Sequence, residues 1–305
     1  MTWSSLVKRS IKGLLVFGSL IILANVIFYL VGFGQAPLVV LDEDIEYYLK
    51  PQMSYRRFGN DITVNRYSMR SVDFDHEKQQ PFYAIIGDSV VYGEHTIDQT
   101  QTLAYILNSQ LKLELQDESV VVGSIAASSW GPGNMLAFYE RFGPFVGNTA
   151  FLVLSSHDRF DIPYMTRRLT PYRVVEPTSA LHDFLQSAIE RLEDKVIGDL
   201  IELPLKRRLS LSEASLVSLI ELLKRDYAKV VMVFHATRKE AINASSKGET
   251  YYATIAKNHK VGFYSTLPFY KALYDKGIDP HGDNIHLSWQ GNQQLSTKLS
   301  TLISD

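Results

Sequence analysis

The stretch FYAIIGDSVV, at residues 82–91, sets the architecture of this chain. Its first six residues are an unbroken apolar run that ends at Gly87, and Asp88 and Ser89 follow at once. A run this short, bounded by turn residues, is typical of a strand that is buried on both faces. A serine directly after such a strand lies at the sheet edge where α/β proteins bind their ligands.

Further apolar runs of similar length follow, and helical patterns separate them. The runs are SVVVGSI (119–125), TAFLVLS (149–155), KVVMVFH (229–235) and VGFYST (261–266). Helices are expected near residues 101–115, 133–142, 178–196, 211–226, 248–258 and 289–303. Strands that alternate with helices predict an α/β domain with a parallel five-stranded sheet between two helical layers.

The composition excludes several classes of function. The chain has 305 residues, of which 46% are hydrophobic and 21% charged, an ordinary globular balance. Its net charge of −2 gives no basic footprint, so we expect no nucleic-acid partner. The absence of cysteine excludes disulfides, zinc–thiolate sites and thiol catalysis.

The N-terminal region predicts a membrane anchor. Residues 13–34 carry no charge and would form a helix of about 33 Å, close to the hydrocarbon thickness of a bilayer. A cleaved signal peptide is the first alternative, although Gly34-Gln35-Ala36 makes a poor cleavage site, and a buried core helix is the second. Lys8, Arg9 and Lys12 precede the segment, and acidic residues follow it from Asp42. The positive-inside rule therefore predicts a single-pass protein of the inner (cell) membrane, with residues 1–12 in the cytoplasm. Residues from about 36 onward are then expected in the periplasm or outside the cell.

Two regions lie outside the predicted strands of the sheet, one before the first strand and one between the third and the fourth. Residues 35–80 are polar and show no sustained period, so we expect a lead-in segment before a domain at 81–305. About 70 residues separate the third predicted strand from the fourth, more than a simple crossover needs. That connection is either a decorated surface loop or the wall of a substrate groove.

A histidine and an aspartate near the C-terminus complete a possible catalytic group with Ser89. A nucleophilic serine needs a base, and the base needs an orienting group. Asp283 and His286, three residues apart after the last strand, can supply both. Asp73-Phe74-Asp75-His76 has the same spacing, but we attribute it to chance because it precedes every predicted strand. His235 ends the fourth strand, and there we expect a supporting histidine.

With these residues in place, the chain resembles the SGNH (GDSL-like) hydrolases, and in particular their exported bacterial members. Gly87-Asp88-Ser89 matches the family's nucleophile block and Asp283-x-x-His286 matches its final block, within a resemblance that covers roughly residues 40–303. The lead-in, including Asn65 and Arg70, also looks like that of exported members. The resemblance implies a flavodoxin-like fold, a Ser89–His286–Asp283 triad and an oxyanion hole.

The two middle blocks depart from the family pattern. Ser129 stands where the family has glycine, and His157 stands where it has an asparagine that donates to the oxyanion. The resemblance implies that the oxyanion hole consists of the backbone N–H groups of Ser89 and Ser129 with the His157 side chain. A substrate contact and a structural role are the alternatives for His157. Trp130 and Asp158, next to these positions, are weaker candidates for substrate contacts.

The resemblance implies a serine esterase or O-acyltransferase, and we expect no cofactor. His281, Asp283 and His286 could suggest metal ligands, but their spacing offers no helix-based pair, so we expect no metal and keep a metal-dependent hydrolase as a further alternative. An exported position favours O-acyl esters of a cell-envelope polysaccharide as substrates, whereas the residues do not identify protein partners. The alternative is a non-catalytic polysaccharide-binding or assembly subunit on a degenerate hydrolase fold, which the departures at Ser129 and His157 motivate.

Overall fold

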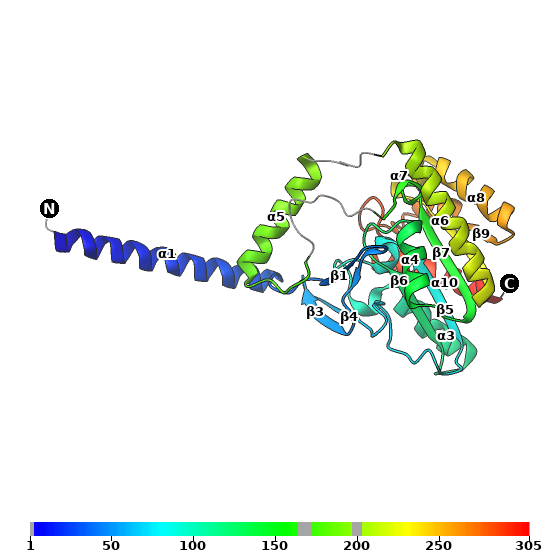
Figure 1. The fold of residues 1–305 in the computed structure, drawn as a ribbon, viewed down its shortest axis with the longest axis horizontal. Coiled ribbons are helices and arrows are strands. Elements are labelled where there is room, and N and C mark those ends of the chain that lie inside the picture. The colour runs from blue at the N-terminus through cyan, green and yellow to red at the C-terminus, as the bar shows by residue number, and fades with distance from the viewer. Residues whose placement is uncertain (1–2, 164–172, 197–202, 305) are drawn as a thin grey trace.

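The computed structural model of the chain describes residues 3–163, 173–196 and 203–304 (Figure 1). Its strands are β1 (Val39–Asp42), β2 (Glu46–Leu49), β3 (Met53–Arg57), β4 (Asn60–Val64), β5 (Phe82–Gly87), β6 (Val121–Ala126), β7 (Gly147–Ser155), β8 (Tyr227–His235) and β9 (Gly262–Ser265). Its α-helices are α1 (Trp3–Val31), α2 (Ser89–Tyr92), α3 (Leu103–Leu115), α4 (Pro132–Phe142), α5 (Ala180–Val196), α6 (Leu205–Asp226), α7 (Arg238–Asn243), α8 (Lys247–His259), α9 (Thr266–Asp275) and α10 (Trp289–Ser304).

Strands β5 to β9 form one sheet in the order β6-β5-β7-β8-β9, and every neighbouring pair is parallel. The first strand of this sheet along the chain is β5. Strand β6 lies on one side of it, and β7, β8 and β9 follow in order on the other side. This is the flavodoxin-like order, in which ligands bind where the strand order reverses, between the first and third strands. The predicted parallel five-stranded α/β fold is confirmed.

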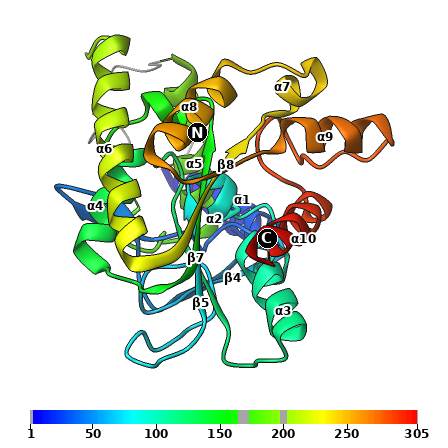
Figure 2. The same ribbon diagram turned by 90° about the vertical axis from the view of Figure 1, so that its right-hand side faces the viewer.

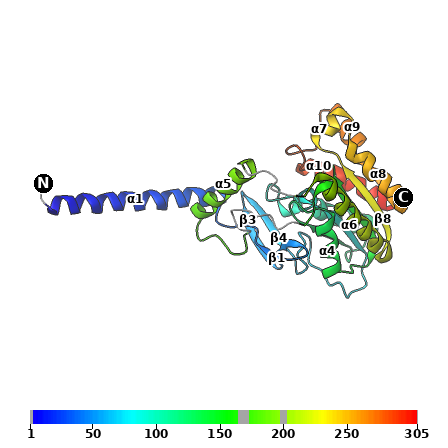
Figure 3. The ribbon, with the colours of Figure 1, turned by 45° about the horizontal axis from the view of Figure 1, so that its top comes forward.

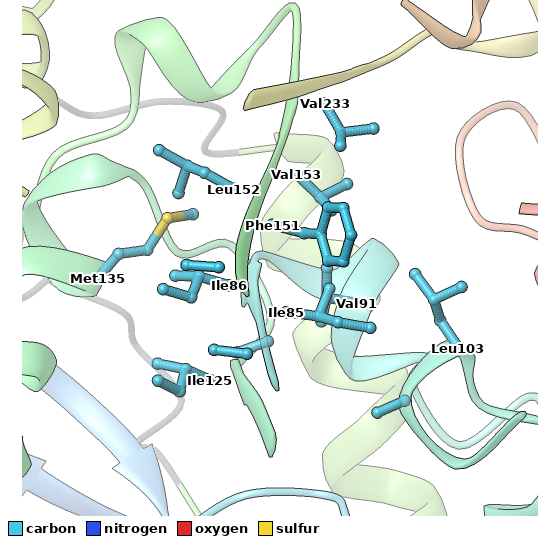
Figure 4. Packing of buried hydrophobic residues seen from close by; sticks show 14 of the residues in the cluster. Ile85, Ile86, Val91, Leu103, Ile125, Met135, Phe151, Leu152, Val153 and Val233 are labelled. Carbon is cyan, nitrogen blue, oxygen red and sulfur yellow. The ribbon is translucent and has the colours of Figure 1, made fainter. Parts of the chain in front are cut away.

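Helices cover both faces of this sheet. Figure 2 shows α4 and α6 on one side and α3, α9 and α10 on the other. Successive residues of a strand point to opposite faces, so both faces of β5 and β7 must be apolar. In Figure 4, Ile86 and Leu152 point to the side of Met135, while Ile85 and Phe151 point to the side of Leu103. Because all six residues of β5 are buried, the sequence shows an unbroken apolar run there rather than an alternating one.

All five predicted strands are present, and their ends differ from prediction by two residues at most. The larger differences are in helices. Helix α6 begins at Leu205, six residues earlier than predicted, and α2, α7 and α9 were not predicted. Helices α2 and α7 are too short to show a helical period, and α9 begins directly where β9 ends, so its start was assigned to the strand.

Residues 35–80 contain regular structure that the sequence did not predict. Strands β1 and β2 form one antiparallel hairpin and β3 and β4 form another. The residues of β3 alternate between buried and exposed. The buried residue at the C-terminal end of the strand, however, is the charged Arg57 rather than an apolar residue. This buried cation conceals the strand pattern, so the two hairpins of the lead-in segment could not be read from the sequence.

Helix α1 projects away from the body of the molecule, and α5 lies beside its C-terminal end (Figures 1 and 3). Within α1, residues Val7–Val31 are long and apolar enough to cross a membrane. The helix ends at Val31 rather than at Gly34 because Gly32 takes a left-handed backbone with φ +109°. A Cβ at Gly32 would lie 2.4 Å from the Phe58 nitrogen, so only glycine fits there.

Candidate active site

Ser89 is the first residue of α2 and follows β5 with only Asp88 between them. The Asp88 Oδ1 atom accepts a hydrogen bond from the Val90 N–H at 2.9 Å, which starts the helix at once. Gly87 permits this tight exit, because a Cβ there would lie 2.6 Å from the Val91 side chain and 2.9 Å from the Val153 oxygen. Ser89 is therefore held at the C-terminal edge of the sheet.

His286 and Asp283 come to this edge from the loop between α9 and α10. The Ser89 Oγ atom lies 2.9 Å from His286 Nε2, and His286 Nδ1 lies 2.7 Å from Asp283 Oδ2. Because the carboxylate only accepts, we assign the imidazole proton to Nδ1, and Nε2 then accepts from the Ser89 hydroxyl. The structure thus brings together the three residues that the sequence singled out.

Asp283 is held as an anion by the turn in which it lies. Its Oδ1 atom accepts hydrogen bonds from the backbone N–H groups of Ile285 and His286, both at 2.8 Å. Burial raises the pKa of Asp283, but the hydrogen bonds from the His286 side chain and from these N–H groups outweigh it and lower the pKa below its ordinary value. The carboxylate can therefore orient His286 and stabilise its protonated form.

His235 and Arg238 support the loop that carries His286. His235 Nε2 donates to the Ile285 oxygen at 2.8 Å, and burial lowers the pKa of His235 to about 3, so this histidine is neutral. Arg238 donates from its backbone N–H to the Asn284 oxygen and from its guanidinium to the His281 oxygen, each at 2.8 Å. His235 occupies the supporting position expected from the sequence.

Ser129, which follows β6, has a left-handed backbone with φ +57°. Glycine adopts this conformation without strain, which accounts for glycine at this position in the family pattern. A residue with a Cβ pays roughly 1–2 kcal/mol for the same conformation. The departure therefore costs stability but leaves the backbone N–H group of residue 129 present.

His157, which follows β7, points its Nε2 atom at two buried carboxylates. That atom lies 3.0 Å from Asp158 Oδ1 and 3.3 Å from Asp88 Oδ2. Burial lowers the pKa of His157, but the charge of Asp158 and the hydrogen bond and charge of Asp88 outweigh it and raise the pKa to about 10. His157 is consequently an imidazolium at neutral pH, and any donation to an oxyanion would come from its Nδ1–H group.

The same three side chains have the geometry of possible metal ligands, since one ligand atom from each of Asp88, His157 and Asp158 lies within 4.8 Å of the others. A histidine must lose its Nε2 proton before that atom can bind a metal. The raised pKa of His157 opposes that loss. Asp88 is the anion that stabilises the proton, because burial and the charge of Asp88 raise the pKa of Asp158 and favour its neutral form. We therefore interpret the cluster as an ion pair between the half-exposed side chain of His157 and the buried carboxylate of Asp88.

Trp130 and Asp158 do not occupy the positions expected of substrate contacts. Trp130 is 1% exposed, and its Nε1–H group donates to the Tyr47 oxygen at 3.0 Å. Asp158 is fully buried, and its Oδ2 atom accepts from the Ser155 N–H at 2.7 Å. Neither side chain is accessible to a ligand as placed, so their positions do not support the substrate contacts predicted for them.

A cavity of about 280 Å³ beside Ser129 was not foreseen from the sequence. Its lining includes Val39, Tyr47, Glu94, Ser128, Ser129 and Glu190. The Glu94 carboxylate accepts a hydrogen bond from the Ser128 hydroxyl, and burial raises the pKa of Glu94. No sequence pattern could have revealed this cavity, because its walls come from four separate segments of the chain.

Arg70 fixes the loop that carries Glu94. This arginine is 1% exposed and donates to the backbone oxygens of Tyr92 at 3.1 Å and Ile97 at 2.7 Å, and also to that of Glu94. A guanidinium in a fixed plane can satisfy several carbonyl groups together. The sequence indicated Arg70 only as part of the lead-in, and its contacts with this loop could not be predicted from the sequence.

Solved structures share this fold, whereas no protein-family model and no curated protein sequence matches the chain. A protein described as a GDSL-like lipase from Parabacteroides merdae superposes over 74% of this chain and 97% of its own, with a TM-score of 0.51 and 9% identity. An acetylxylan esterase from Geobacillus stearothermophilus covers 74% of this chain and 94% of its own, with a TM-score of 0.48 and 14% identity. A lipolytic G-D-S-L protein from Veillonella parvula covers 73% and 98%, with a TM-score of 0.46 and 12% identity.

The strand order, the serine after the first strand of the sheet and the likeness to the Parabacteroides merdae structure agree with one another. They also agree with the resemblance that the sequence blocks indicated. The chain has the fold of the SGNH hydrolases.

Proposed function

We propose that this protein is a serine esterase or O-acyltransferase of SGNH type. The hydrogen-bonded series Ser89–His286–Asp283 carries the proposal, because it supplies a nucleophile, a base and an orienting anion in the geometry that acyl transfer needs. The fold adds support, since these groups lie at the sheet edge where ligands bind.

In the first half-reaction, Ser89 Oγ attacks the carbonyl carbon of an ester while His286 Nε2 takes the hydroxyl proton. The oxyanion that forms is stabilised by the N–H groups of Ser89 and Ser129 and by the His157 imidazolium. The bond to the alcohol then breaks, the alcohol leaves with the proton from His286, and an acyl-enzyme remains. Attack by water would release a carboxylic acid, whereas attack by a sugar hydroxyl would form a new ester.

Neither Ser89 nor His286 lines the cavity beside Ser129, which touches the candidate site through Ser129, and its small size suits a short acyl group better than a long chain. Its volume of about 280 Å³ lies just below the range of ligand sites, which span roughly 300–1,000 Å³. Its lining combines hydroxyl, carboxyl and phenol groups with aliphatic ones, a surface suited to a small ester on a polar carrier. We therefore propose O-acyl groups of a cell-envelope polysaccharide as the substrate class.

The proposal places this chemistry outside the cytoplasm, on a retained membrane anchor. Helix α1 would span the membrane, with residues 1–12 in the cytoplasm and the domain at 81–305 on the other side. The charge difference between the two ends of the apolar segment supports this orientation. A cleaved signal sequence is the alternative, and the size of the mature membrane-bound protein distinguishes the two.

The test is covalent labelling with a fluorophosphonate, combined with acetate release from small aryl acetates by the full chain. We expect an adduct on Ser89 and activity that Ser89→Ala abolishes, whereas Ser109→Ala, at an exposed position of α3, leaves both unchanged. Turnover should be insensitive to a metal chelator.

Absence of an adduct on Ser89 in folded protein would remove the serine mechanism. Glycan binding without turnover, unaffected by Ser89→Ala, would support the non-catalytic subunit instead. Loss of activity on chelation would point to a metal-dependent hydrolase.

A further inference from the structure

Helix α5 turns its polar face towards the protein and its apolar face outwards. Asp183 is fully buried, and Ser187 and Glu190 lie one and two turns further along the same face. On the opposite side, the residues that recur at helical spacing are aliphatic and exposed: Leu185 by 51%, Ile189 by 52% and Leu192 by 60%. A helix on the surface of a water-soluble domain has the reverse arrangement.

Ion pairs fix α5 in this orientation. Asp183 lies 2.6 Å from the Arg57 guanidinium, contacts that of Arg173 as well, and accepts from the Gly34 N–H at 2.8 Å. The Arg173 guanidinium also donates to Ser187 Oγ at 2.7 Å. Rolling the helix to bury its aliphatic stripe would leave these buried charges without partners, which is strongly unfavourable. The outward apolar face is therefore built into the structure.

The first turns of α5 pack against the outer end of α1. The rings of Phe28 and Phe184 stack with their centroids 3.9 Å apart, and Asn25 Oδ1 accepts from the Leu181 N–H at 3.1 Å. Figures 1 and 3 show α5 inclined to α1 and extending sideways from its C-terminal end. Asn25 and Phe28 both lie within Val7–Val31, the part of α1 that could cross a membrane. The beginning of α5 is thus at the level where that span would leave the hydrocarbon.

We propose that α5 lies in the outer interface of the membrane that α1 crosses, with Leu185, Ile189 and Leu192 among the lipid acyl chains. Interfacial helices bury an apolar face about 5–10 Å into the boundary between headgroups and chains. The bilayer is the occupant that the geometry favours, because the exposed stripe adjoins the apolar surface of α1 through Phe28 and Phe184. This inference rests on the proposal that α1 remains in the membrane.

Docking of α5 would fix the candidate active site relative to the lipid surface. Glu190 of α5 and Arg173, which holds α5 through Asp183, both line the cavity beside Ser129. The cavity wall and the membrane contact are therefore opposite faces of one helix. A substrate esterified close to the membrane surface would meet the site in a defined orientation.

The test is site-specific labelling with a fluorophore on a single introduced cysteine. The chain has no cysteine of its own, so each variant carries one label at a known position. The full chain is reconstituted in phosphatidylethanolamine–phosphatidylglycerol vesicles with an environment-sensitive fluorophore at Leu185→Cys, Ile189→Cys or Leu192→Cys. Lipids that carry a quencher at headgroup level are compared with lipids that carry it near the chain end. Gln186→Cys, on another side of α5, and Leu113→Cys, on distant α3, are the controls. Leu20→Cys, in the middle of the apolar part of α1, reports on the anchor.

We expect the three α5 labels to lose fluorescence mainly to the headgroup-level quencher, and the Leu20 label mainly to the chain-end quencher. The control labels should respond instead to a quencher dissolved in the water. If the Leu20 label is quenched by lipid but the α5 labels respond only to the aqueous quencher, the inference is wrong and the anchor stands. If the Leu20 label is not quenched by lipid, the anchor fails and the inference fails with it.

Discussion

Ser129 and His157 are the two residues of the candidate site at which this chain departs from the SGNH pattern, and local physics accounts for both. Ser129 keeps a backbone that suits glycine, at φ +57°. His157 gains a charge that an asparagine would lack, because the buried carboxylate of Asp88 stabilises its protonated form. Neither departure removes a hydrogen-bond donor, so both are compatible with an oxyanion hole.

Ser129→Gly should stabilise the folded protein without loss of activity. Glycine relieves the left-handed strain but gives the unfolded chain more freedom, so we expect a net gain of up to about 1 kcal/mol in the free energy of unfolding. Urea unfolding of the full chain in detergent measures it, with Ser129→Ala as the control that retains a Cβ. Equal stability of the glycine and alanine variants would show that the backbone is not strained.

The His157 ion pair should make stability depend on pH in the alkaline range. The folded pKa of about 10 lies above the ordinary value of about 6.5, so the stabilisation is complete below about pH 6.5 and is lost as the pH rises through 10. The difference in unfolding free energy between wild type and His157→Asn should therefore shrink over this interval. Urea titrations at a series of pH values measure it. A difference that stays constant from neutral pH to above pH 10 would contradict the ion pair.

At the scale of single elements, strands and loops differ in how they are fixed. The strands of the sheet are determined by their own apolar residues, as β5 shows with six buried positions in succession. The loops at the sheet edge depend on distant side chains. Arg70 of the lead-in holds the loop after α2, and Arg238 of α7 holds the loop of His286. The candidate site is thus assembled by long-range polar contacts on a locally determined scaffold.

Arg70→Lys should loosen the loop after α2 and lower kcat/KM. A lysine cannot reproduce the planar set of donors, and the loss of one or two charged hydrogen bonds costs roughly 1.5–3 kcal/mol. Hydrogen exchange of residues 93–98 should rise, because their carbonyl groups lose a common partner. Arg66→Lys, at an exposed pair with Asp73, is the matched control and should leave exchange and activity unchanged. Unchanged exchange at residues 93–98 in the Arg70 variant would show that the clamp has no positional role.

At the scale of the whole molecule, one carboxylate joins three parts of the chain. Asp183 of α5 binds the Gly34 N–H after α1, Arg57 at the end of β3, and Arg173. Burial raises the pKa of Asp183, but the hydrogen bonds from Arg57, Gly34 and Arg173 outweigh it and lower the pKa. The C-terminal end of α1 and helix α5 are therefore held to the β3–β4 hairpin by a buried ionic contact.

Asp183→Asn should destabilise this junction strongly. The side chain of Arg57 is 4% exposed and that of Arg173 is 10% exposed, so both would lose a buried counter-ion, at a cost of about 3–5 kcal/mol. In wild type the same contribution is present above the unfolded pKa of about 3.9 and is lost as the pH falls through the lower folded value. Limited proteolysis between α1 and β1, with urea unfolding, measures the effect.

Asp73→Asn, which breaks an exposed pair with Arg66, should cost under about 1 kcal/mol. Equal effects of the two substitutions would show that the Asp183 contact does not hold the junction.

The sequence by itself determined the five strands, the apolar helix and the three residues that meet above the sheet. Those features depend on runs and periods of neighbouring residues, and parallel strands bring their C-terminal ends to one edge whatever connects them. Only the tertiary structure decided that β3 ends in a buried arginine, that Glu94 and Ser128 share a cavity wall, and that α5 faces outwards with its leucines. These depend on ion pairs and hydrogen bonds between residues as far apart as Arg57 and Asp183, and such pairings leave no periodic trace along the chain.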